Sequence, residues 1–194
     1  MSQPLPTVAV IVGSARTGSI NQALARALGR LAEGRLDFRF VRIDDLPMFN
    51  GDFENDPPES VWRFKREVEA ADAVLFVTPE YNRSVSPLLK NAIDWGSRPW
   101  GKNSWAGKPG AVTGATPGQT GVAAAQQHLR NIVSPLQVLL LTQPEAYVQL
   151  APEAIDAEDR LTNEGQRQFL QGFVDAFADW VERLVPAKRE SMAA

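Results

Sequence analysis

The sequence predicts an α/β fold, a three-layer sandwich in which one five-stranded parallel sheet lies between two layers of helices. Short apolar runs rich in β-branched residues alternate with longer segments whose apolar residues recur at helical spacing, and the alternation repeats five times. Continuous apolar runs are typical of strands that are buried on both faces, as in parallel sheets. The 194 residues of the chain are enough for one domain with a substantial core.

The five expected strands are marked by their apolar side chains and by the turn residues that follow them. Gly13 ends the first run, and Thr78 and Pro79 end the third. The second run alternates apolar and charged residues, which is typical of a strand nearer a sheet edge. The strands are expected at residues 8–12, 36–43, 73–77, 110–114 and 138–141.

The expected helices carry start and stop signals. Ser19 and Gln22 have the spacing of a capping box, and leucines at helical spacing follow them. Ser86 is expected as an N-cap before Pro87 at the first helical position, and Gly96 ends that helix. The other helices are expected at residues 61–71, at residues 120–132 and after a cap at Thr162, the last one with a core stripe of Phe169, Phe173, Phe177, Trp180 and Leu184.

The order of the strands follows from the rules for connections between parallel strands. Right-handed crossovers restrict the topology, and the flavodoxin-like order 2-1-3-4-5 is the common five-stranded arrangement. Ligands of such sheets bind beyond the carboxyl ends of the strands at the switch point, here between the first and third strands. We therefore expect residues 1–194 to form a single domain of this fold, with residues 186–194 as a frayed tail.

Composition and charge exclude several classes of protein. The net charge of −3 disfavours an extended nucleic-acid surface. The chain has no cysteine and His128 is its only histidine, so disulfides, thiolate catalysis and a His-rich metal site are excluded, and we expect no metal. No run approaches the roughly 18 apolar residues that span a bilayer, and no signal segment opens the chain, so we expect a cytoplasmic protein without membrane insertion.

The loop after the first expected strand, residues 13–21, has the composition of an anion-binding turn. Its glycines and small hydroxyl residues let backbone N–H groups converge on an anion at a helix N-terminus, and Arg16 can add a charge-assisted contact. Its spacing matches neither the lysine-containing phosphate loop of nucleotide hydrolases nor the Gly-x-Gly-x-x-Gly turn of dinucleotide-binding folds. A single terminal phosphate fits better, and the alternative is a capped turn with an incidental arginine.

Two further loops follow the third and fourth strands and are expected at the same edge of the sheet. Residues 79–87 form a loop stiffened by proline and helix capping, where backbone groups can contact a flat ligand while Tyr81 covers apolar area. Residues 114–121 contain glycines that allow the backbone to approach a ring closely. Taken alone, the second loop equally fits a rigid connection with a surface tyrosine, and the third is a weak signal.

These segments together resemble one known family. The run Gly-Ser-Ala-Arg-Thr-Gly-Ser-Ile-Asn at residues 13–21, Pro-Glu-Tyr-Asn at residues 79–82 and Leu-Lys-Asn-Ala-Ile-Asp-Trp at residues 89–95 look like the NADPH-dependent FMN reductase family. That family includes bacterial NAD(P)H:quinone, chromate and ferric reductases, and the resemblance extends from about residue 8 to about residue 185. It implies an enzyme that carries FMN, takes electrons from NAD(P)H and reduces small acceptors such as quinones, ferric complexes, chromate, azo compounds or flavins.

The resemblance also implies roles for individual residues. The positions that bind the FMN phosphate correspond to Ser14, Arg16, Ser19, Ile20 and Asn21. The loop along the isoalloxazine ring corresponds to Pro79, Glu80, Tyr81 and Asn82. In the third loop this chain has Ala115 and Thr116 beside the flavin, where relatives often have a serine, so only backbone contacts are expected to persist there.

Further expectations concern the substrates and the assembly. Arg98 and Tyr81 are expected to contact NAD(P)H or an anionic acceptor, because in the family the region of Arg98 borders the flavin pocket, often that of the neighbouring subunit; a surface charge is the alternative. No side chain is expected to be catalytic, since hydride is transferred at N5 of FMN. The family implies a homodimer or homotetramer, in which His128 either lies at an interface or has a structural role, which we favour.

One other function fits the same fold. A flavodoxin-like electron carrier would bind FMN without its own turnover of NAD(P)H. The Pro-Glu-Tyr-Asn segment and the arginine and tryptophans of residues 98–105 favour the reductase.

Overall fold

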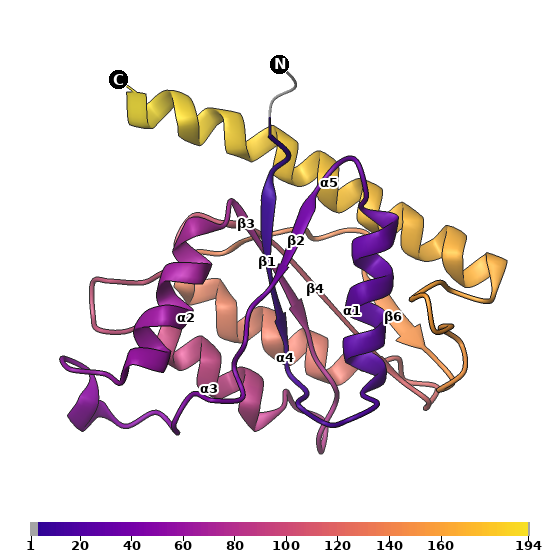
Figure 1. Ribbon diagram of the computed structural model, residues 1–194, viewed down its shortest axis with the longest axis horizontal. Helices are drawn as coiled ribbons and strands as arrows, with labels where there is room; N and C mark the ends of the chain where they lie inside the picture. The colour runs from indigo at the N-terminus through magenta and orange to yellow at the C-terminus, as the bar shows by residue number, and fades with distance from the viewer. Residues whose placement is uncertain (1–3, 194) are drawn as a thin grey trace.

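The computed structural model describes residues 4–193 of the chain, with side chains through residue 185. Its strands form one parallel sheet in the order β2-β1-β3-β4-β5, with β6 also paired to β4, which confirms the predicted flavodoxin-like topology. Figure 1 shows this sheet with the long C-terminal helix α5 crossing the molecule above it. The strands are β1 (Thr7–Val12), β2 (Asp37–Phe40), β3 (Ala73–Val77), β4 (Pro109–Thr116), β5 (Leu139–Leu140) and β6 (Ala146–Gln149).

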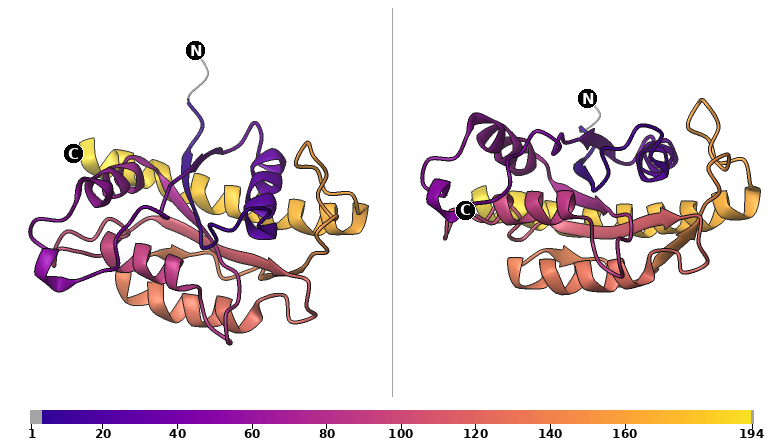
Figure 2. Two further views of the ribbon diagram at one scale, coloured as in Figure 1. Left: turned by 60° about the horizontal axis from the view of Figure 1, so that its bottom comes forward. Right: turned by 90° about the horizontal axis from the view of Figure 1, so that it is seen from below.

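Helices cover both faces of the sheet, and each face has its own apolar core. Figure 2 shows the sheet seen along its edge, with α1 on one side and α4 on the other. One cluster of buried residues joins α1 and α5 to the sheet, and the other joins α2, α3 and α4 to its opposite face. The helices are α1 (Ile20–Leu31), α2 (Glu59–Ala70), α3 (Pro87–Gly96), α4 (Ala123–Val133) and α5 (Glu164–Ala193).

The edge of the sheet beside β4 differs from the prediction, because two short strands replace the expected single one. Residues 139–140 pair with Pro109 and Gly110 of β4, whereas β6 pairs with residues 113–116 farther along the same strand. The polar segment between β5 and β6 interrupts the pairing, and β6 was not predicted. The second strand is also shorter than expected, because only residues 37–40 pair with β1.

The helix caps follow the sequence signals at two of the three expected positions. The Ser19 hydroxyl accepts the Gln22 N–H at 3.3 Å, and Ser86 accepts the Leu89 N–H at 3.2 Å. The Gln22 side chain does not return to Ser19 but donates to the Ser14 carbonyl at 3.0 Å, so only half of the capping box forms. The prediction of Thr162 as a cap was wrong, because Asn163 instead accepts the Gln166 N–H at 2.9 Å.

The aromatic stripe of α5 is only partly core. Phe173 and Phe177 are buried against the sheet as expected, whereas the side chain of Phe169 is exposed, which corrects its assignment to the core. Trp180 is half-buried and donates its indole N–H to the Leu139 carbonyl at 2.7 Å, so it covers the short edge strand β5. The helix is continuous to Ala193, through the segment that was expected to fray, and the side chains of that segment lie outside the described residues.

Candidate functional site

The carboxyl ends of β1, β3 and β4 lie at one edge of the sheet, and the loops that follow them surround a pocket of about 230 Å³. This pocket lies at the switch point, because β1 pairs with β2 on one side and with β3 on the other. All of the expected cofactor residues except Asn82 line it. They are Ser14, Arg16, Ser19, Ile20, Asn21, Pro79, Glu80, Tyr81, Ala115 and Thr116.

The first loop brings the N-terminus of α1 to the pocket. The backbone N–H groups of Ile20 and Asn21 occupy the first turn, where the helix has no carbonyl acceptors for them, and the helix dipole is positive there. Arg16 is exposed, and its one hydrogen bond within the described residues is a long contact of 3.5 Å to the Gly18 carbonyl. The N–H groups of Ile20 and Asn21, beside a guanidinium that makes one long hydrogen bond, favour a ligand with a terminal anionic group.

Asn21 joins the first loop to the end of β4. Its side chain is only 3% exposed, donates to the Ala115 carbonyl at 3.0 Å and accepts the Ala115 N–H at 2.8 Å. The side-chain amide of Asn21 therefore bonds within the protein, and only its backbone N–H is available to a ligand. This pairing also fixes the backbone of Ala115.

The second loop is anchored through Glu80. The Glu80 carboxylate accepts the N–H of Ala125, the third residue of α4, at 3.1 Å. Val122 precedes α4 in the left-handed conformation (φ 58°) and provides no side-chain cap, so Glu80 supplies the acceptor that the helix start needs. Residues 79–81 thus face the pocket from a position that α4 holds in place.

The tip of the second loop is a tight turn whose central residues do not line the pocket. Tyr81 and Ser84 exchange backbone hydrogen bonds of 2.9 and 3.0 Å around Asn82 (φ 51°) and Arg83 (φ 67°). Two consecutive positive φ angles define a type I′ turn. Asn82 is consequently outside the pocket, while the half-exposed ring of Tyr81 lies at its rim.

His128 holds this turn from α4. Its Nδ1 lies 2.8 Å from the Ser84 hydroxyl. The contact joins the only histidine of the chain to the loop beside the pocket, and its structural role stays a prediction.

Two prolines complete the pocket and were missed by the sequence analysis. Pro117 follows Thr116 directly, so a longer third loop would have included it. Pro152 belongs to the segment between β6 and α5, and nothing in the sequence placed that segment near the switch point because β6 itself was not expected.

The structure does not bring Arg98 to this pocket. Helix α3 begins after the carboxyl end of β3 and runs back along the sheet, so residues beyond Gly96 lie toward the opposite edge. There Arg98 lines a separate hollow of about 410 Å³, with its guanidinium 5.8 Å from the ring of Trp100 and 3.7 Å from the carboxylate of Glu54. A contact between Arg98 and a ligand of the switch-point pocket therefore requires a second copy of the chain.

Among the described residues, no three His, Asp or Glu side chains come close enough together to hold a metal ion. None of the helices in the described part of the chain has an apolar stretch long enough to span a bilayer. The expected cytoplasmic location stays a prediction.

The fold and the pocket define a class of protein: a flavodoxin-like α/β domain with a pocket at the switch point of its sheet. Residues 6–153 match the family described as NADPH-dependent FMN reductase, and the chain belongs to this family. Membership confirms the family predicted from the three loop segments and, with it, the predicted class of NAD(P)H-dependent reductases.

Individual relatives agree with this assignment. A 2-hydroxy-1,4-benzoquinone reductase of Burkholderia sp is 47% identical over 174 residues, which cover 90% of this chain and 95% of the relative. The structure of FerB, a flavoenzyme NAD(P)H:(acceptor) oxidoreductase from Paracoccus denitrificans, is 51% identical, with a TM-score of 0.89 and coverage of 93% of this chain and 99% of that one. A flavodoxin, WrbA-like protein from Agrobacterium tumefaciens shares the fold at 19% identity, with a TM-score of 0.62 and coverage of 93% and 99%.

Proposed function

We propose that the protein binds FMN in the switch-point pocket and works as an NAD(P)H-dependent reductase of small acceptors such as quinones. One observation carries the proposal: all but one of the residues that the sequence assigned to FMN line a single pocket at the start of α1, although they come from three separate segments of the chain. The names of its relatives, a benzoquinone reductase and an NAD(P)H:(acceptor) oxidoreductase, support the same chemistry.

The proposed phosphate site consists of Ser14, Arg16 and Ser19 together with the first two amides of α1. Both serines are buried at the base of the loop, and the guanidinium of Arg16 is available for a charge-assisted hydrogen bond. The Ser19 hydroxyl also accepts the Gln22 N–H, so its proton remains free to be donated to a phosphate oxygen.

The proposed ring site lies between the second and third loops. Residues 79–81 and the backbone of Ala115 and Thr116 would contact the edge of the isoalloxazine, and Pro117 and Pro152 would bound it. Asn82 has no part in this proposal, because it does not line the pocket. When bound, FMN supplies the redox chemistry, and the chain supplies binding, orientation and the exclusion of water from the covered part of the ring.

Tyr81 is proposed as the side chain that meets the substrates. Its ring is 50% exposed at the rim of the pocket, and the turn held by His128 fixes its backbone. An aromatic ring in this position can pack against the nicotinamide or against a quinone, since both are flat. No side chain of the pocket is needed as a nucleophile or base.

Kinetics with FMN-loaded protein separate the reductase from the electron carrier. The proposal predicts catalytic oxidation of NADPH or NADH that depends on both FMN and an added benzoquinone. Protein that binds FMN but gives no turnover with either nucleotide would instead be a carrier.

We also propose that the protein forms a homodimer or homotetramer. Three large apolar side chains around the η1 turn (Gly51–Phe53) are exposed: Met48 by 73%, Phe53 by 54% and Trp100 by 86%. The Trp100 N–H donates to the Glu54 carboxylate at 2.8 Å, which places Trp100 beside that turn. Sedimentation of the native protein and of a Phe53→Ser, Trp100→Ser double variant tests this proposal, which predicts dissociation of the variant; native protein that sediments as a monomer contradicts it.

A further inference from the structure

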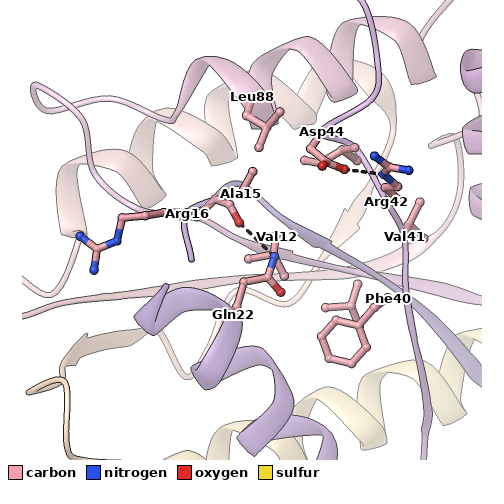
Figure 3. A pocket seen from close by; sticks show the side chains of 12 residues that line it. Val12, Ala15, Arg16, Gln22, Phe40, Val41, Arg42, Asp44 and Leu88 are labelled. Atoms are coloured by element: carbon pink, nitrogen blue, oxygen red, sulfur yellow. Dashed lines mark hydrogen bonds and ion pairs between the residues drawn. The ribbon is translucent and has the colours of Figure 1, made fainter. Parts of the chain in front are cut away.

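Another hollow, of about 390 Å³ and distinct from the one around Arg98, lies on the other side of the first loop, at the ends of β1 and β2. Ser14 and Arg16 line both this hollow and the switch-point pocket, so the loop that is proposed to hold the FMN phosphate separates them. Figure 3 shows Gln22 and Phe40 on one side of this opening, Arg42 and Asp44 on another, and the side chain of Arg16 directed away from that pair. A molecule that extends from the FMN pocket across the loop would enter this hollow.

One wall of the hollow is apolar and suits a flat ring. Val10 and Val12 of β1 are buried and form its base, and Leu88 of α3 contributes a further apolar side chain. Phe40 is 47% exposed at the end of the edge strand β2, although it is a large aromatic residue. An exposed aromatic side chain over an apolar base is a typical surface for packing a heterocycle.

The opposite wall is charged, and its Arg42 and Asp44 belong to a surface ion-pair network that continues through Asp45 to Arg63. Arg42 Nε donates to Asp44 Oδ1 at 2.7 Å, and both side chains are largely exposed. The hydrogen bond from Arg42 lowers the pKa of Asp44, so its carboxylate is an ionised acceptor near neutral pH. In dinucleotide-binding α/β folds, a carboxylate beyond the second strand accepts a hydrogen bond from the ribose 2′-hydroxyl, and an arginine there binds a 2′-phosphate.

We propose that this hollow binds the adenosine half of NAD(P)H, with Phe40 against the adenine, Asp44 as acceptor for the ribose hydroxyl and Arg42 as donor to the 2′-phosphate. The inference rests on the proposed function, since it assigns the second substrate of that reaction a binding site. It makes Arg42 and Asp44 the residues that set the ratio of NADPH to NADH turnover.

Arg39 provides a matched control for Arg42. Both arginines lie on or directly after β2, both are exposed and both pair with an aspartate two residues away, but Arg39 pairs with Asp37 and does not line the hollow. Arg42→Ala is expected to lower kcat/KM for NADPH about tenfold or more, because it removes a charge-assisted hydrogen bond, and to change NADH turnover little. Arg39→Ala is expected to leave both unchanged, and equal effects of the two variants would overturn the proposal.

Calorimetry adds a readout that does not depend on turnover. With FMN present in excess to fill the phosphate loop, adenosine 2′,5′-bisphosphate is expected to bind native protein and Arg39→Ala, and to bind Arg42→Ala at least about tenfold more weakly. Phe40→Ser is expected to weaken this ligand and adenosine 5′-phosphate alike. Equal affinity of all four proteins for the bisphosphate overturns the inference.

The same experiments distinguish the inference from the function on which it rests. Normal FMN binding and turnover with unaltered NADPH preference in Arg42→Ala would contradict the adenosine site and leave the reductase intact. A protein that takes up no FMN would contradict the proposed function. Titration of the bisphosphate into native protein, Arg42→Ala and Arg39→Ala would then still decide whether the hollow binds an adenosine nucleotide, because of these two arginines only Arg42 lines it.

Discussion

The side-chain amide of Asn21 forms two hydrogen bonds with the backbone of Ala115, one as donor and one as acceptor, across 94 residues of sequence. The pair connects the first turn of α1 to the end of β4, and the two segments line opposite parts of the pocket. The separation of these two segments of the pocket therefore depends on a buried amide.

Replacement of Asn21 is expected to affect stability and cofactor binding together. Asn21→Ala leaves a buried N–H and C=O of Ala115 without partners, so we expect the free energy of unfolding in urea to fall by about 1–3 kcal/mol. Affinity for FMN should fall as well, because the two sides of the pocket lose their connection. Asn50→Ala is the control, since the exposed Asn50 amide bonds to residue 52 where water can replace it; equal losses in both variants would contradict the role of Asn21.

Arg16 is expected to contribute directly to FMN binding. It makes one long hydrogen bond within the described residues, so its substitution should leave the unfolding free energy nearly unchanged. A hydrogen bond to a charged group contributes about 1.5–3 kcal/mol, so Arg16→Ala should weaken FMN roughly tenfold to a hundredfold. Quenching of flavin fluorescence measures this affinity, with Arg30→Ala on the far end of α1 as control. Unchanged affinity in Arg16→Ala would contradict the role of Arg16 and leave the serine hydroxyls and backbone amides as the proposed phosphate ligands.

Glu80 is expected to act on stability through the start of α4. Glu80→Ala removes the acceptor for the Ala125 N–H and should cost about 1 kcal/mol of unfolding free energy. Glu80→Gln keeps an acceptor oxygen and should lose less, because only the charge interaction with the helix dipole disappears. Thermal and urea unfolding of both variants tests the assignment, which fails if Glu80→Ala is as stable as the native protein.

Lys65 is expected to make the free energy of unfolding depend on pH in the alkaline range. Its side chain is buried and donates to the carbonyls of Gly96 and Lys102 and to the Ser104 hydroxyl, and burial lowers its pKa below 10.5. Between the lowered pKa and 10.5 the unfolded chain binds more protons than the folded chain, so this residue makes stability rise with pH in that window.

The test of this dependence compares Lys65→Met with the native protein in urea at increasing alkaline pH. The unfolding free energy of the native protein should rise relative to that of Lys65→Met as the pH increases through the window, because only the native protein carries the titrating group. Lys90→Met, at an exposed ion pair with Asp94, is the control. A difference that stays constant with pH would refute the assignment to Lys65.

The parallel core of the fold could be predicted from the sequence because its signals are local. Residues 8–12 and 73–77 are continuous apolar runs, and Ser86 with Pro87 marks the start of α3. The split edge strand was not predictable in this way, since β5 has only two paired residues and β6 depends on its pairing with β4. The cap of α5 was misplaced by one residue, because Thr162 and Asn163 are both capable caps and only the folded contact of Thr162 with Ala154 separates them.

The pocket could be predicted to the extent that its residues follow parallel strands. Ser14 and Tyr81 follow β1 and β3, and Ala115 lies at the carboxyl end of β4. Strands that run parallel bring such positions to one edge of the sheet. Two features of the pocket could not be predicted from local sequence. The turn after Tyr81 leaves Asn82 outside the pocket, and the side-chain amide of Asn21 bonds to the backbone of Ala115. The position of Arg98 within the chain depends on the length and direction of α3, which place it in another hollow, and its contact with a substrate stays a prediction.

The most direct test of the central claim is the visible spectrum of the protein during anaerobic addition of NADPH and then of a quinone. We predict that purified protein takes up FMN in equal proportion, that NADPH bleaches the flavin absorption, and that benzoquinone restores it. A protein that takes up no FMN, or a bound flavin whose absorption neither NADPH nor NADH changes, would contradict the account.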